Sequence, residues 1–320
     1  MNKKKMIILG LVITLVLGAY DVFAGGSKES SKAKKVEIAF IPPGMVSPFY
    51  AGTIEGAKQA AAEFGFELLI LSPERENDYA GLLKIAEDMI TRKVAAIAMC
   101  SIDTETTVAA VKKANAAGIP VILFNTLVKI PSGDVYAYVG YDQRAAGRSV
   151  AEYILNKYPG KQINAVIIEG LPSSFTTERA GGFMDVLNEK KPANVKVVAS
   201  QPGDWEREKS MNVAANLLQA YPEINMFYGL SDEMALGAAQ ACKAKGKTDV
   251  IIIGIDGNPN AINAVAAGDI TATVNVKPPL IGYKAIEAVK KALNKEALSS
   301  PFIVTDTIIV DKSNVDQFKK

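Results

Sequence analysis

The sequence contains no histidine and only two cysteines. Without imidazole, serine–histidine and cysteine–histidine nucleophiles are excluded, and so are zinc sites built on histidine. Aromatic residues make up only 7% of the chain, with a single tryptophan. The composition therefore offers little for nucleophilic catalysis, and we expect neither a metal nor a cofactor.

The chain also has no large excess of charge of either sign, because 36 Lys and Arg residues are nearly matched by 34 Asp and Glu residues. No basic excess is available to hold a nucleic-acid backbone, so we expect no nucleic-acid partner. Hydrophobic residues make up 49% of the 320 residues and charged residues 22%. These values are typical of a packed globular protein with about two domains.

No apolar run is long enough to cross a membrane. Met6–Ala19 is almost wholly apolar but has 14 residues, and a spanning helix needs about 20. Three lysines precede the run and Val22-Phe23-Ala24 ends in a small residue. This pattern predicts a signal peptide over 1–24, a disordered leader over 25–35 and export from the cytoplasm, with an uncleaved anchor as the alternative. No cysteine lies near the cleavage site, so we expect no lipid anchor.

Export would permit a disulfide between Cys100 and Cys242. Cys100 ends an apolar strand pattern, and Cys242 lies on a helical pattern far along the chain. We expect two free, buried thiols rather than a bridge.

Short strand-like segments alternate with alanine-rich helical segments along the chain. The predicted strands are Val36–Ile41, Glu67–Leu71, Ala95–Met99, Pro120–Phe124, Val135–Val139, Asn164–Glu169, Val195–Ser200, Met226–Gly229, Val250–Ile255, Thr271–Val276 and Thr307–Val310. The predicted helices are Phe49–Phe64, Tyr79–Thr91, Thr104–Ala117, Arg144–Asn156, Glu178–Lys190, Glu206–Ala220, Glu233–Lys245 and Leu280–Leu293. Apolar strands alternating with helices predict parallel sheets covered on both faces.

Eleven strands fit two lobes better than one sheet, with a break near Gly140–Asp142. Neither lobe has a glycine-rich nucleotide fingerprint. In parallel α/β sheets, ligands bind beyond the carboxyl ends of the strands. Candidate binding residues should therefore follow the predicted strands.

Aromatic and polar side chains do follow them. Ser47 can cap a helix that starts at Pro48, which places Phe49 and Tyr50 in its first turn. Trp205 is the only tryptophan and is predicted to start a helix capped by Asp204. In each case the alternative is a ring that merely packs in the core.

Further polar groups follow other strands, with helix capping as the alternative role for Ser231 and Asp256. Arg179 is predicted in the first turn of a helix, against the helix dipole, so another partner should hold it. The remaining candidates are Asn125, Thr126, Ser231 and Asp256. Flat rings beside hydrogen-bonding groups suit sugars and polyols, whose C–H faces pack on rings and whose hydroxyls donate and accept.

Six stretches together resemble the ribose-binding branch of the type I periplasmic sugar-binding proteins of ABC transporters. They are Ser47–Tyr50, Gly118–Ile122, Glu178–Phe183, Ser200–Trp205, Ser231–Ala238 and Gly254–Gly257. The resemblance implies two doubly wound α/β lobes joined by three crossover strands, near 140–142, 276–278 and 304–306. The lobes would be 36–140 with 277–304, and 141–276 with 305–320.

The resemblance also implies sugar contacts for Phe49, Tyr50, Trp205, Arg179 and Asp256. Ser47 and Ser231 stand where ribose binders have Asn, and Asn125 and Thr126 stand where they have Asp-Arg. Ile255 replaces a Phe and Val276 a Gln. These departures remove polarity, so we expect a less polar ligand than ribose, such as a pentose variant, deoxysugar, polyol or furanose-like molecule.

The leading interpretation is thus a monomeric substrate-binding protein, not an enzyme, that delivers a sugar or polyol to a membrane permease. The alternative with the same fold is a receptor for chemotaxis or quorum-signal sensing. A lactose-repressor-type regulator would need a helix-turn-helix in place of the export signal. A glycosidase would need two facing acids, which the spacing of Asp103, Glu169 and Asp256 does not provide. Without histidine, affinity should be nearly constant between about pH 6 and 8 unless a buried carboxylate is strongly shifted.

Overall fold

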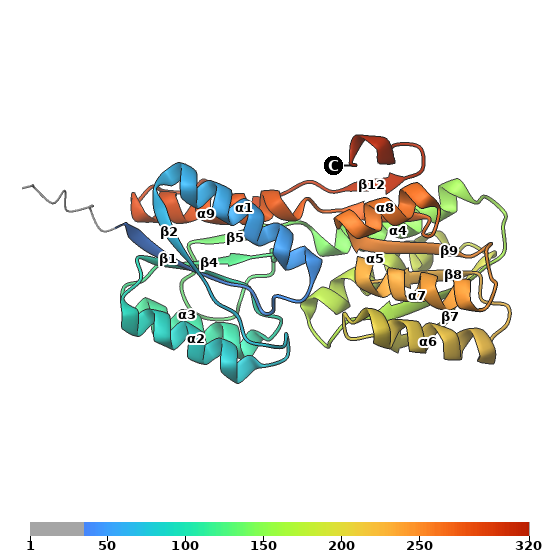
Figure 1. Ribbon diagram of the computed structural model, residues 1–320, viewed down its shortest axis with the longest axis horizontal. Helices are drawn as coiled ribbons and strands as arrows, with labels where there is room; N and C mark the ends of the chain where they lie inside the picture. The colour runs from blue at the N-terminus through green and yellow to red at the C-terminus, as the bar shows by residue number, and fades with distance from the viewer. Residues whose placement is uncertain (1–34, 320) are drawn as a thin grey trace, which may run out of the picture. The chain divides into compact units, whose positions relative to one another are not determined.

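The computed structural model describes residues 35–319. The predicted signal peptide and nearly all of the predicted leader lie outside the described residues. Within them, no helix combines the length and apolarity that a membrane span requires. The described chain forms two six-stranded sheets, each covered by helices (Figure 1).

The first sheet is parallel throughout, in the order β11-β5-β4-β3-β1-β2. Its strands are β1 (Val36–Ile41), β2 (Phe66–Ile70), β3 (Ala96–Met99), β4 (Val121–Phe124), β5 (Ala137–Gly140) and β11 (Phe302–Val304). Its helices are α1 (Pro48–Phe64), α2 (Tyr79–Arg92), α3 (Thr104–Ala116) and α9 (Pro278–Leu293).

Alternate residues of β1 pack on opposite faces of this sheet. Ile38 and Phe40 pack in the cluster that contains α1 and α9, whereas Ala39 and Ile41 pack with α2 and α3. This division follows from the two-residue period of a strand. Figure 1 shows the two helix pairs on opposite sides of the sheet.

The second sheet has the order β12-β10-β9-β8-β6-β7, with only the β10–β12 pair antiparallel. Its strands are β6 (Ile163–Glu169), β7 (Val195–Pro202), β8 (Met226–Gly229), β9 (Ile251–Asp256), β10 (Ala272–Asn275) and β12 (Ile308–Asp311). Its helices are α4 (Gln143–Lys157), α5 (Ser174–Lys190), α6 (Arg207–Ala220), α7 (Asp232–Ala244) and α8 (Pro259–Ala267), and a 3₁₀ turn covers Val315–Gln317.

The chain passes between the sheets three times: between β5 and α4, between β10 and α9, and between β11 and β12. Two of these segments are hydrogen-bonded to each other, because the Thr305 amide donates to the Gly140 carbonyl at 2.7 Å. The predicted fold class is confirmed: two doubly wound α/β lobes joined by three crossovers.

Each predicted strand overlaps an observed one, but β11 and α8 were not predicted. Two helix starts differ from the prediction in ways that matter for the site, and a third agrees with it. Helix α5 begins at Ser174 rather than Glu178, so Arg179 lies in the second turn and not against the first-turn dipole. Helix α6 is preceded by Glu206 at its N-cap, so Asp204 does not cap it. Helix α7 begins with the predicted Ser231 cap, which accepts a hydrogen bond from the Met234 amide.

Cys100 and Cys242 are free and buried, as predicted. Burial raises the pKa of the Cys100 thiol to about 12 and that of Cys242 to about 11. Both therefore stay protonated and unreactive at neutral pH.

Helices α4 and α5 pack at a distance that only glycine permits. A Cβ on Gly182 would come within 2.0 Å of the Arg144 carbonyl oxygen, whereas a Cβ on the neighbouring Gly181 would meet only the end of the Arg144 side chain, at 2.8 Å. Gly182→Ala should therefore lower the free energy of unfolding by about 1–3 kcal/mol through overpacking. Gly181→Ala should be neutral or stabilising by up to about 1 kcal/mol, since Ala favours helix over Gly. Urea unfolding measures both, and equal stability of the two variants would contradict the close helix contact.

Candidate binding cleft

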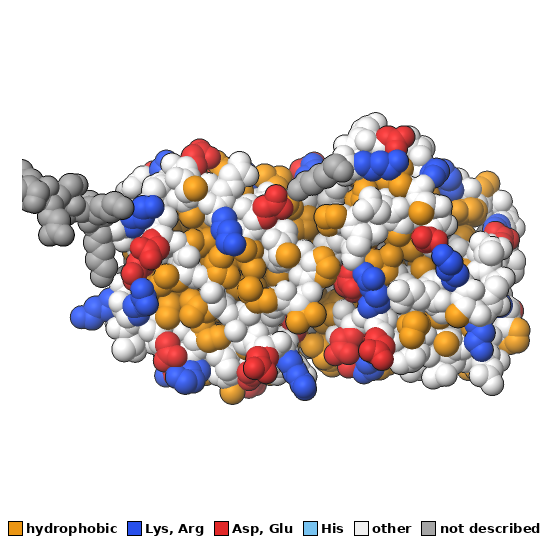
Figure 2. Space-filling model, in the orientation of Figure 1, with side chains coloured by type: hydrophobic (Ala, Val, Ile, Leu, Met, Phe, Trp, Pro, Cys, Tyr) orange, Lys and Arg blue, Asp and Glu red, His pale blue; other side chains and the backbone are white. Residues whose placement is uncertain are grey.

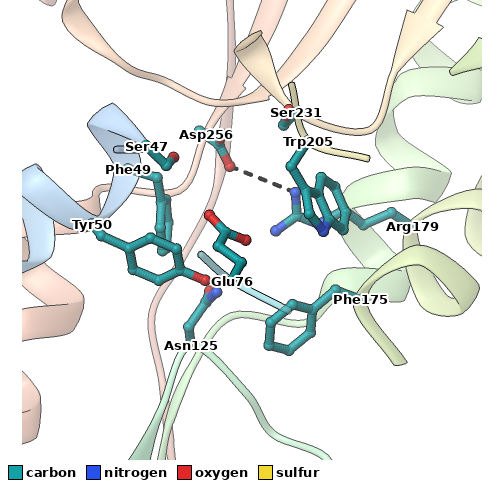
Figure 3. A pocket seen from close by; sticks show the side chains of 10 residues that line it. All are labelled: Ser47, Phe49, Tyr50, Glu76, Asn125, Phe175, Arg179, Trp205, Ser231 and Asp256. Carbon is teal, nitrogen blue, oxygen red and sulfur yellow. Dashed lines mark ion pairs between the residues drawn. The ribbon is translucent and has the colours of Figure 1, made fainter. Parts of the chain in front are cut away.

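A cavity of about 360 Å³ lies beyond the carboxyl ends of strands from both sheets. Each lobe contributes five residues to its lining, and Figure 3 shows their side chains converging. From the first lobe come Ser47, Phe49, Tyr50, Glu76 and Asn125; from the second come Phe175, Arg179, Trp205, Ser231 and Asp256. Most of these residues are buried.

The aromatic wall of the first lobe is built by the start of α1. Pro48 occupies the first helical position, and Phe49 and Tyr50 follow with only 4% of each exposed. Their rings meet edge to face, with centroids 5.1 Å apart. Ser47 stands at the N-cap, but its hydroxyl makes no capping hydrogen bond. This hydroxyl therefore remains available to the cavity.

Arg179 is the centre of the second-lobe wall. Its Nε donates to Gln143 Oε1 at 2.6 Å, and its Nη1 donates to the Leu230 carbonyl at 2.6 Å and lies 3.6 Å from Asp256 Oδ1. The guanidinium lies 5.3 Å from the centre of the Trp205 ring. A buried cation needs such partners to offset lost hydration, and they fix its position in the wall.

Backbone strain is concentrated at this cleft. Within residues 35–319, eight non-glycine residues have positive φ angles. Three of them follow helix ends, where that conformation is common. The other five are Asn125, Asp204, Trp205, Asp256 and Lys277. Three of these five line the cavity. Left-handed backbone costs about 1–3 kcal/mol at such residues and is concentrated at functional sites in proteins, which independently supports a functional role for this cavity.

Two buried polar atoms at the cavity lack a hydrogen-bond partner within the described residues. They are Asn125 Oδ1 and Trp205 Nε1. An unpaired buried polar group costs about 1–3 kcal/mol. A hydroxylated ligand would relieve this cost because each hydroxyl can both donate and accept.

Glu76 adds a carboxylate that the sequence analysis missed. It is half-buried, and no hydrogen bond or ion pair reaches its carboxylate from residues 35–319. Burial raises its pKa from 4.5 to about 7, although the nearby Arg179 opposes the rise. Glu76 is therefore a shifted carboxylate of the kind named above as an exception to a constant affinity between pH 6 and 8.

Eight of the eleven predicted site residues line the cavity: Ser47, Phe49, Tyr50, Asn125, Arg179, Trp205, Ser231 and Asp256. Thr126 lies in an adjoining cavity that shares Phe175 with the first, and its hydroxyl accepts a hydrogen bond from the Val128 amide. Ile255 and Val276 lie away from the lining, fully buried in the hydrophobic core. Among the residues of β9, Asp256 is the one that lines the cavity.

Both missed residues follow strands, so the strand-end argument could have found them. Glu76 lies in the loop between β2 and α2, in the run Ser72–Asp78. Phe175 lies in the first turn of α5, which the prediction had started four residues too late. The Ser173 cap, whose hydroxyl accepts from the Thr176 amide, marks the true start.

Two lobes with a shared cavity at their strand ends have the layout of a two-domain binding protein. The chain belongs to the periplasmic binding protein family, whose domain profile matches residues 38–297. It is similar to the ribose import binding protein of Salmonella typhimurium, with 30% identity over 311 residues, 97% of this chain and 99% of that protein.

Two further relatives bear on the cleft. The D-allose-binding periplasmic protein of Escherichia coli is 33% identical over 258 residues, covering 78% of this chain and 82% of that protein. The crystal structure of an ABC transporter periplasmic solute binding protein from Actinobacillus succinogenes, with bound D-allose, superposes with a TM-score of 0.83. That match has 30% identity and covers 88% of this chain and all of the other.

The raised pKa of Glu76 predicts a pH-dependent stability. The unfolded chain ionises Glu76 near 4.5 and the folded chain near 7, so stability falls as pH rises between these values and is constant above them. Glu76→Gln removes this penalty and should raise the free energy of unfolding by up to about 3 kcal/mol at pH 8 but little at pH 4. Urea unfolding at both pH values measures the difference.

The matched control is Glu74→Gln, which removes an exposed carboxylate from the same loop. It should change stability by less than about 0.5 kcal/mol at either pH. Parallel pH profiles for the wild type and Glu76→Gln would show that Glu76 is not buried in the folded protein.

Proposed function

We propose that this protein is the substrate-binding component of an ABC-type sugar importer. It binds a monosaccharide, polyol or similar small hydroxylated ligand between its lobes and delivers it to a membrane permease. The observation that carries this proposal is the cavity itself: rings from both lobes, a fixed guanidinium and unpaired polar atoms converge on one closed space. The names of the relatives, which refer to ribose and allose, support the ligand class.

The proposal includes the parts of the prediction that concern the whole protein. The signal peptide over 1–24 would direct the chain to the periplasm without a lipid anchor, and the mature protein would act as a monomer and not as an enzyme. The bodies that close would be 36–140 with 277–304, and 141–276 with 305–320. Because the ligand would contact both bodies, it would favour the closed state over the open one.

The ligand contacts are proposed for the residues that line the cavity. Phe49 and Trp205 offer rings to C–H faces of the ligand. Arg179 and Asp256 offer a forked donor and a carboxylate to neighbouring hydroxyls. Asn125 and Ser231 supply amide and hydroxyl groups from opposite lobes.

Isothermal titration with D-ribose, D-allose, D-apiose, glycerol and myo-inositol tests this function. At least one should bind, and Arg179→Ala should weaken that binding at least 100-fold by leaving Asp256 and the ligand hydroxyls unpaired. Arg148→Ala is the control, because Arg148 pairs with Glu189 on the outer surface of α4 and its loss should leave affinity unchanged. Absence of binding for the whole panel at millimolar concentration would count against the sugar proposal.

Trp205 provides a second, optical test. It is the only tryptophan and lines the cavity, so a saturating ligand should change its fluorescence. A spectrum that stays unaltered while calorimetry shows binding would assign Trp205 a structural role only. Recovery of the ligand chemically unchanged after incubation distinguishes binding from turnover.

A further inference from the structure

The three ionisable side chains Glu76, Arg179 and Asp256 line the cavity together with the tyrosine Tyr50. Arg179 and Asp256 form an ion pair, with Nη1 3.6 Å from Oδ1. Tyr50 is neutral, because burial raises its pKa well above the usual value. Glu76 adds a second carboxylate beside the single arginine of this lining, and Figure 3 shows it in the middle of the cavity.

The surface that adjoins the cavity is also rich in negatively charged side chains. An adjoining cavity, here called the vestibule, shares Ser47, Glu76 and Trp205 with the first cavity. The vestibule is lined by residues 74–77 and 204–208, Gly44, Val46, Ser47, Leu171 and Glu233. Six carboxylates but only two arginines line it. Arg207 is already held by Glu233 through two hydrogen bonds of 2.8 and 2.9 Å. Figure 2 shows acidic side chains gathered near the start of α6.

A second observation indicates that this region receives a ligand rather than only solvent. Asn125 is 2% exposed, lines the cavity with Glu76, and has an Oδ1 atom without a partner within residues 35–319. A buried acceptor without a partner is stabilised when a ligand donates a hydrogen bond to it. At their positions, Asn125 Oδ1 and the Glu76 carboxylate both favour a ligand group that donates and disfavour a carboxylate or phosphate group, which can only accept. Trp205 Nε1, the other unpaired atom, favours a ligand oxygen that accepts, and a neutral hydroxyl satisfies both kinds of position.

We propose that the cleft is a charge filter in which Glu76 excludes anionic ligands and admits neutral or amine-bearing polyols. Sugar acids and sugar phosphates would meet an acidic vestibule and then the Glu76 carboxylate, while Arg179, the one basic residue among the described lining residues, is already paired with Asp256. This inference rests on the proposed function, because it describes which members of the sugar and polyol class the same cleft accepts.

Charged quenchers of Trp205 fluorescence test the filter without any ligand. Trp205 is partly exposed and lines both the cavity and the vestibule. At pH 8, caesium should quench it at least threefold more strongly than iodide, after each is normalised to a free tryptophan derivative, with neutral acrylamide reporting accessibility. Glu76→Gln should reduce this caesium preference at least twofold, and Glu74→Gln should reduce it less. Equal quenching by the two ions in the wild type, or equal effects of the two variants, would overturn the proposal.

A matched series of sugars tests the ligand class. D-Allose, 6-amino-6-deoxy-D-allose and D-alluronate differ in one group and in charge. The acid should bind at least tenfold more weakly than D-allose, and Glu76→Gln should recover most of that difference. An acid that binds the wild type as tightly as D-allose would overturn the filter. If none of the three binds, the proposed function loses support, and the quenching experiment alone decides the filter.

Discussion

The cleft depends on how one buried guanidinium is held. Arg179 is 4% exposed and would be unstable there without its contacts to Gln143, Leu230 and Asp256. Gln143 in turn donates from Nε2 to the Asn125 carbonyl, at 3.0 Å. Because Asn125 belongs to the first lobe and Arg179 to the second, this chain of hydrogen bonds joins the two walls of the cavity through one side chain next to the first crossover.

The two lobes repeat one arrangement, which explains why the walls are complementary. Each sheet has the order in which its second strand lies at one edge and its first strand beside the third. In such sheets the strand ends at the switch in chain direction form a natural ligand site. Two such sites face each other here, so a small molecule between them contacts loops after β1, β2 and β4 on one side and after β6, β7, β8 and β9 on the other.

Much of this could be predicted from sequence because the physical rule is local. Apolar strands alternating with helices identify parallel sheets, and the residues that follow each strand identify the cavity wall. Phe49, Trp205 and Asp256 were found in this way. The lobe arrangement, by contrast, came from the family resemblance and from strand counting, since nothing in a single strand tells which sheet it joins.

The failures also have physical causes. The nine residues of α8 and the three of β11 are too short to show a clear period. Phe175 was hidden by an early helix start among Ser and Thr residues. The raised pKa of Glu76 depends on burial by residues distant in sequence, so composition alone suggested a pH-insensitive pocket. Ile255 and Val276 were assigned by correspondence with relatives and lie in the core instead.

The positive φ angles at Asn125 and Asp256 have a consequence for how this pocket can evolve. The φ angle of 61° at Asn125 lies in the left-handed helical region, which Asn, Asp and Gly tolerate with least penalty. The φ angle of 141° at Asp256 lies outside that region, where glycine is the residue with least penalty. Few residues can therefore replace either one without strain. Ser47 and Glu76 carry no such restriction. In related proteins that evolve to bind a different ligand, substitutions should therefore appear first at the unstrained positions. The strained positions should stay conserved.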